Sequence, residues 1–268
     1  FERAKERMKD SNSSYGHQTK MAFKSAIEIY LASLYSKGRD MEKAISSHRG
    51  FLENCFRHEV TAKYVIYLSG NFNQFKKFEY AIEVLEGSMD MIKTVEESDQ
   101  AKIIFYLIDA YIGCGEFLKA KAADKKRRST NIDCWHAEFQ AGQIEAEMCN
   151  YEAAIDHYRE GVTELQLHEY DGLNGMRVAN FVGLATSLLK HSTHNEAEAF
   201  ALLQEEIDHR LTLRNDREWI LFHMGIEYRK INKWDQSIKN LHQLCLSASR
   251  PESIMLPQAN EAMAQTYL

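Results

Sequence analysis

Residues 222–241 read FHMGIEYRKINKWDQSIKNL, and their spacing indicates a pair of antiparallel helices. Two small residues, Gly225 and Ser237, stand twelve positions apart, with Tyr228 three residues after the first and Trp234 three residues before the second. Two helices approach closely only where their crossing point carries little side chain, while large neighbours fill the space beside the crossing. The stretch therefore predicts a helical hairpin that crosses at Gly225 and Ser237.

The same pairing recurs through the chain, which predicts a repeat. It is complete in six places: Ala32 with Ala44, Ser69 with Ala81, Ile108 with Ala120, Gly142 with Ala154, Ala185 with Ala197, and Gly225 with Ser237. Only one first member, Ile108, is large. An ordinary amphipathic bundle predicts a period of about 3.6 residues but not this fixed pairing.

The spacing resembles that of the tetratricopeptide repeat (TPR), in which helical hairpins stack in series. This resemblance implies an all-α fold, a right-handed superhelical solenoid. We expect residues 1–268 to form a single solenoid of about six complete repeats with partial repeats at both ends. The 2 prolines and 13 glycines agree, because a sandwich or barrel needs a turn about every ten residues.

The net charge and the lengths of the apolar stretches limit the classes of partner that the chain can bind. The net charge of -6 argues against general nucleic-acid binding, which requires Lys and Arg to neutralise phosphates, and it favours a basic peptide. The longest strongly apolar stretch, residues 103–114, contains Asp109 and is shorter than the roughly 20 residues that a membrane-spanning helix needs. We therefore expect a protein ligand, with no direct contact to nucleic acid or membrane.

Motifs for catalysis and metal binding are absent from the sequence. It contains no glycine-rich phosphate loop, no nucleophile elbow and no H-E-x-x-H, and its 5 cysteines form no C-x-x-C pair. The 11 histidines are scattered singly, which favours surface or packing roles. We expect no enzyme activity, no cofactor and no metal. The catalytic alternative is a phosphatase-like TPR protein of the bacterial Rap type, but no acid–base residue stands out for it.

The first helices of a TPR solenoid line its concave side, so the candidate binding residues are sought there. Counting from the small residue of each first helix selects six of them: Tyr67, Tyr106, Asp109, Gln140, Gln143 and His223. Aromatic and polar groups together suit an extended peptide. The clamp by which chaperone-binding TPRs hold an acidic C-terminus needs a cluster of Lys, Arg and Asn. Only Lys63, Asn73 and Lys102 are available here, which disfavours that ligand.

A basic run is the second candidate site. Lys125, Lys126, Arg127 and Arg128 end the predicted second helix of the third repeat, where cations complement the helix dipole. The run is either a solvated helix end or a local patch for an acidic protein or a phosphate.

Several short strings, in order along the chain, resemble the N-terminal TPR region of the Tonsoku-like proteins. They are FER (1–3), LEG (85–87), GEFLKAK (115–121), LATSL (184–188), EEI (205–207) and SRP (249–251). This resemblance implies a nuclear scaffold of chromatin that binds core histones, joins an MMS22-like partner and supports DNA repair at stalled replication forks.

The alternative family is the LGN/Pins adaptors of spindle orientation and G-protein signalling, which act in the cytoplasm or at the cell cortex. Their repeats read Leu-Gly-Asn across the small position. Here the six corresponding triplets end in Ser33, Gly70, Asp109, Gln143, Thr186 and Ile226, and none carries the asparagine. A divergent member of that family stays open as the second hypothesis.

Overall fold

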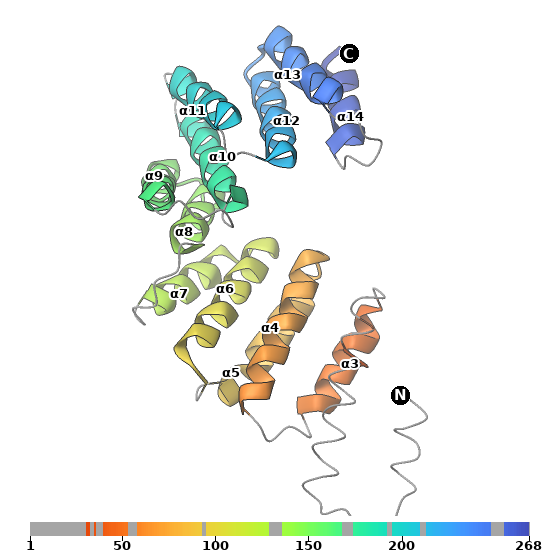
Figure 1. Cartoon of the computed structure of the whole chain (residues 1–268). Coiled ribbons are helices and arrows are strands. Elements are labelled where there is room, and N and C mark those ends of the chain that lie inside the picture. The colour runs from red at the N-terminus through yellow and green to blue at the C-terminus, as the bar shows by residue number, and fades with distance from the viewer. Residues whose placement is uncertain are drawn as a thin grey trace, which may run out of the picture. The chain divides into compact units, whose positions relative to one another are not determined.

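The computed structural model describes residues 31, 32, 35, 40–52, 58–92, 95–128, 136–167, 174–191, 195–209, 213–247 and 255–267. Within these ranges the chain forms twelve α-helices and no strand, which confirms the predicted all-α class (Figure 1). The helices are α3 (Met41–Leu52), α4 (His58–Gln74), α5 (Phe78–Ile92), α6 (Glu97–Gly113), α7 (Phe117–Arg128), α8 (His136–Glu147), α9 (Tyr151–Leu167), α10 (Asn174–His191), α11 (Glu196–Asp208), α12 (Arg214–Lys230), α13 (Trp234–Ser247) and α14 (Met255–Tyr267).

The described helices fall into two compact units, residues 1–134 and 135–268. In the first unit α4 pairs with α5 and α6 pairs with α7, while α4 also packs along α6. Large apolar side chains that face one another across these contacts have no exposed surface, among them Leu68, Phe72, Leu85, Ile103 and Ile108. One continuous solenoid over both units stays a prediction.

The second unit repeats the plan with α8 and α9, α10 and α11, and α12 and α13 as hairpins, followed by α14. The first helices α8, α10, α12 and α14 contact one another in series. One hydrophobic core runs through this unit from Ala154 to Ala262. Helix α14 packs on α12 and α13. The partial repeat expected at the C-terminal end stays a prediction, and the one at the N-terminal end lies outside the described residues.

Four of the hairpins turn in the same way. The residue five positions before each second small residue has a positive φ: Lys76 (55°), Gly115 (76°), Cys149 (60°) and Asn232 (62°). The next N–H then donates to the carbonyl oxygen five residues back, as from Lys77 to Phe72 at 2.8 Å and from Lys233 to Tyr228 at 2.9 Å. This is the Schellman ending, which pairs otherwise orphaned carbonyl groups of the first helix.

The predicted crossings are close contacts. Ala32, Ala44, Ser69, Ala81, Ala120, Ala154, Ala185 and Ser237 have no exposed surface. A Cβ added at Gly142 would stand 2.8 Å from the Tyr158 ring, and one added at Gly183 would stand 2.5 Å from the same ring. Tyr158 of α9 therefore lies in a slot between a glycine of α8 and a glycine of α10.

The fifth repeat corrects one predicted position. Ala197 is exposed, whereas Ala199, two residues later, is fully buried. Leu203, four residues after Ala199, supports this corrected register. It is 1% exposed, and it corresponds to Leu85 and Leu241, which stand four residues after the small residue in their repeats. The connection after α10 is longer than in the other hairpins, so the twelve-residue spacing selected the wrong alanine.

Candidate protein-binding face

Two tyrosines lie together on the first helices of the first unit. Tyr67 of α4 is 41% exposed and is one of six large apolar side chains that are exposed in the described part of the chain. The half-buried ring of Tyr106, on α6, lies against Gly70, where an added Cβ would stand 3.3 Å from the ring. Because Gly70 follows Tyr67 by three residues, the two share one side of α4, so both tyrosines lie on the side where α4 meets α6.

An asparagine holds this arrangement in place. Asn73 Nδ2 donates a 2.9 Å hydrogen bond to the carbonyl oxygen of Tyr106, which joins α4 to α6. The half-buried Asp109 follows Tyr106 by three residues and so lies on the same side of α6. We call Tyr67, Tyr106 and Asp109 the tyrosine face. Three of the predicted groove residues thus lie on the sides of α4 and α6 that face each other in the first unit.

The predicted groove residues of the second unit do not form a comparable surface. Gln140 is fully buried, so it offers nothing to a partner and was wrongly placed in the groove. Gln143 is half-buried on α8. The His223 ring packs edge-on against Trp219 at 4.6 Å between ring centroids, and burial lowers the His223 pKa from its ordinary value. Packing is the main role visible for this histidine.

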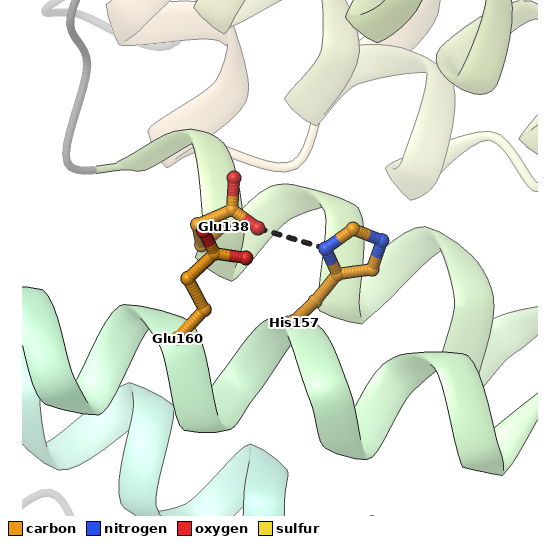
Figure 2. A group of neighbouring side chains, drawn as sticks. All are labelled: Glu138, His157 and Glu160. Atoms are coloured by element: carbon orange, nitrogen blue, oxygen red, sulfur yellow. Dashed lines mark hydrogen bonds and ion pairs between the residues drawn. The ribbon is translucent and has the colours of Figure 1, made fainter.

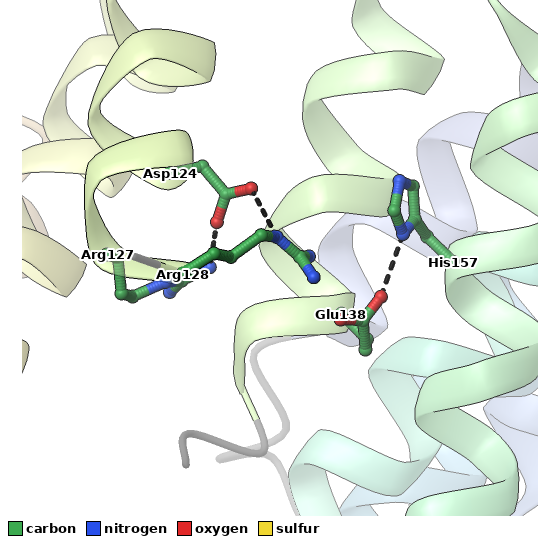
Figure 3. Close-up of polar contacts among 5 residues, drawn as sticks. All are labelled: Asp124, Arg127, Arg128, Glu138 and His157. Carbon is green, nitrogen blue, oxygen red and sulfur yellow. Dashed lines mark hydrogen bonds and ion pairs between the residues drawn. The ribbon is translucent and has the colours of Figure 1, made fainter. Parts of the chain in front are cut away.

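The predicted basic patch is smaller than its sequence suggested, because Arg127 and Arg128 both bind Asp124 (Figure 3). Arg127 is 1% exposed and forms a charge-assisted hydrogen bond with Asp124, so it does not belong to an open patch. Arg128 Nε also binds Asp124, at 2.9 Å. Lys125 and Lys126 are exposed. One carboxylate therefore offsets part of the positive charge, which favours the solvated helix end.

A third group was missed in the sequence. Glu138 of α8 and His157 and Glu160 of α9 each offer one ligand atom within 4.8 Å of the others (Figure 2). His157 Nδ1 lies 2.7 Å from Glu138 Oε2. The H-x-x-E spacing of His157 and Glu160 was a readable signal, since residues three apart share a helix face. Glu138 stands nineteen residues before His157, and only the hairpin brings it near.

Comparisons with known proteins support the helical-repeat architecture. No protein-family model matches the chain, and no curated protein matches it. A solved tetratricopeptide repeat protein from Parabacteroides merdae matches with a TM-score of 0.61 at 11% identity, over 91% of this chain and 84% of that one. The apo form of RapI matches with a TM-score of 0.58 at 13% identity, over 90% of this chain and 83% of that one.

These likenesses concern the fold. The chain has a TPR-type helical fold. Among the described helices, none is both long and apolar enough to cross a membrane.

Proposed function

We propose that the chain is a non-catalytic scaffold that binds an extended, basic protein segment on the tyrosine face. The exposure of Tyr67 beside Tyr106 and Asp109 carries this proposal. Aromatic rings attract Lys and Arg side chains through their π faces, and a carboxylate within reach adds a charge-assisted hydrogen bond. The net charge of -6 attracts a basic ligand over longer distances.

Among basic segments, a core histone tail is the ligand that we favour. The resemblance to the Tonsoku-like proteins supports this choice, and with it a nuclear role in DNA repair at replication forks and an MMS22-like partner. Lys and Arg side chains of such a tail are the groups that tyrosine rings and a carboxylate attract. Because the tyrosine face consists of side chains of α4 and α6 alone, the first unit carries the whole binding site in this proposal.

Calorimetry with a Lys- and Arg-rich histone-tail peptide tests the proposal. The Asp109→Lys variant is expected to bind more weakly by about 1–3 kcal/mol, because a repelling charge replaces an attracting one. Tyr67→Ala, which truncates an exposed ring, is expected to weaken binding with little effect on thermal melting. Asp235→Lys makes the same charge change at an exposed position of α13 and serves as the control.

Two outcomes count against the proposal. If the wild-type protein does not bind the peptide at moderate salt, the histone assignment is wrong. If the peptide binds and neither Asp109→Lys nor Tyr67→Ala weakens it more than Asp235→Lys, the partner stands but the tyrosine face is not its site.

A further inference from the structure

The group of Glu138, His157 and Glu160 combines three metal-binding side chains on two packed helices. Its ligand atoms lie within 4.8 Å of one another, with one contribution from α8 and two from α9 (Figure 2). A tetrahedral ion with bonds of about 2.0–2.2 Å separates its ligand atoms by about 3.4 Å. Shifts of about 1 Å in the ligand atoms, which side-chain rotations provide without backbone movement, are therefore of the size needed to bring the three atoms to this spacing.

The helices hold these residues firmly. His157 and Glu160 share a face of α9, and Glu138 faces them from the first helix of the same hairpin. The close contact of Gly142 with the Tyr158 ring sets the separation of α8 and α9 immediately beside His157. Sites built on packed helices keep their geometry better than sites on loops.

Burial in the group is graded. Glu138 is 6% exposed, whereas His157 is half-buried and Glu160 is exposed. A carboxylate in a largely dehydrated position attracts a cation more strongly than one in water, because water screens it less. The exposed Glu160 leaves a path by which an ion can enter from solution.

A buried acceptor beside the group is a second, independent sign. Asn180 of α10 has no exposed surface; its Nδ2 donates to the Met176 carbonyl oxygen at 3.0 Å, and its Oδ1 has no hydrogen-bond partner. A Cβ added at Gly161 would stand 2.5 Å from this Oδ1 and 3.4 Å from Glu138 Cβ. The orphaned oxygen and the Cβ of Glu138 therefore both lie next to Gly161, the residue that follows Glu160. A buried unpaired acceptor calls for a missing donor, water or ion.

We infer that Glu138, His157 and Glu160 form a binding site for a divalent transition-metal ion, with Zn²⁺ as the best fit. One imidazole nitrogen and two carboxylate oxygens are an accepted donor set for Zn²⁺, and a water completes four ligands. Mg²⁺ and Ca²⁺ fit less well because they prefer oxygen ligands alone. This inference is independent of the peptide-binding proposal.

Titration of the full chain with ZnCl₂, followed by calorimetry, tests the inference. The wild type is expected to bind one Zn²⁺ ion per chain at this site, with a heat that saturates as the site fills. His157→Gln and Glu160→Gln are each expected to weaken binding at least about tenfold. Glu160 is exposed, so Glu160→Gln tests the site without disturbing the fold.

Matched controls separate this site from other ligands. Glu152→Gln changes an exposed glutamate of α9, and His242→Gln changes an exposed histidine of α13; both are expected to bind as the wild type does. Cys149→Ser removes a thiol that is exposed in the described part of the chain and that itself attracts Zn²⁺, and it should leave the site intact. No saturable binding by the wild type, binding that survives both His157→Gln and Glu160→Gln, or binding lost in Cys149→Ser overturns the inference.

Discussion

The Ser237 hydroxyl donates a 2.7 Å hydrogen bond to the carbonyl oxygen of Gly225, twelve residues earlier in the chain. The bond crosses from α13 to α12 at the point where both helices carry their smallest side chains, and Ser237 is fully buried there. A buried hydroxyl without a partner is costly, so the carbonyl makes serine acceptable where other repeats have alanine. The hairpin therefore depends on close backbone approach at Gly225.

Gly225→Ala is expected to destabilise the protein by about 1–3 kcal/mol. The new Cβ would stand 2.6 Å from Leu241 Cγ and 2.7 Å from its Cδ2, so α12 and α13 must separate. Urea unfolding followed by circular dichroism measures the change. Gly175→Ala is the control, because an added Cβ meets nothing within 4 Å at that exposed helical position. Equal midpoints for Gly225→Ala and the wild type would show that the crossing is looser than described.

Ala199→Arg is expected to cost at least about 2 kcal/mol, because it forces a charged side chain into a fully buried position. Ala197→Arg, on the same helix and with the same change, should stay near the wild type because Ala197 is exposed. Thermal melting of the two variants checks the register of α11. The opposite order of the two melting temperatures would restore the register expected from the twelve-residue spacing.

These two alanines mark how far spacing alone predicts the fold. Small residues at crossings are visible in a sequence, because almost nothing else fits between close helices, and five of the six predicted pairs are buried as expected. The length of the connection between helices has no such signature. The connection after α10 is longer than in the other hairpins, so the twelve-residue spacing selected Ala197 in place of Ala199. Gly183 was missed for a related reason, since its partner Tyr158 belongs to the preceding hairpin.

The candidate sites were predictable only in part. Helix periodicity predicts which residues share one side of a helix. It could therefore place Tyr67 on the same side of α4 as Gly70, and Asp109 on the same side of α6 as Tyr106. Whether a side chain is buried depends on the helices that pack against it. Residue spacing along the sequence therefore could not show that Gln140 and Arg127 are buried. The group of Glu138, His157 and Glu160 joins two helices, and no pattern within one helix contains it.

Lys76→Gly is expected to stabilise the first unit by about 1 kcal/mol, because Lys76 holds a φ of 55° that glycine adopts without strain. Gly115→Ala makes the reverse change at the equivalent turn, where φ is 76°, and should cost about the same amount. The site at Gly115 is open, so any loss there reports backbone strain and not a clash. Chemical denaturation of both variants gives the two values.

Lys76→Ala completes this comparison. It removes the long side chain and keeps the Cβ, so it should unfold near the wild type if strain is the cause. A gain in Lys76→Ala as large as that in Lys76→Gly would assign the effect to the lysine charge and contradict the strain argument.

His48 is expected to make the stability of the first unit depend on pH. It is 1% exposed, its ring lies 5.5 Å from that of Tyr64 between centroids, and neither ring nitrogen has a hydrogen-bond partner in the described part of the chain. Burial, helped by the charge of Arg49, lowers the His48 pKa from 6.5 to about 4. The unfolded chain therefore binds a proton between these two pH values that the folded chain does not.

The sign follows from this difference in bound protons. The contribution of the neutral His48 ring to the free energy of unfolding is fully present above pH 6.5. It falls as the pH drops from 6.5 towards about 4, and it changes no further below that value. The full loss is at most about 3 kcal/mol, from the size of the pKa shift.

His48→Leu removes this dependence, because it places a non-titrating side chain at the position that Leu85 and Leu241 hold in other repeats. Urea unfolding of both proteins between pH 4 and 7 checks the prediction, with His242→Leu as the exposed control. Parallel curves for the wild type and His48→Leu across that range would mean that the buried ring accepts its proton without cost to the fold.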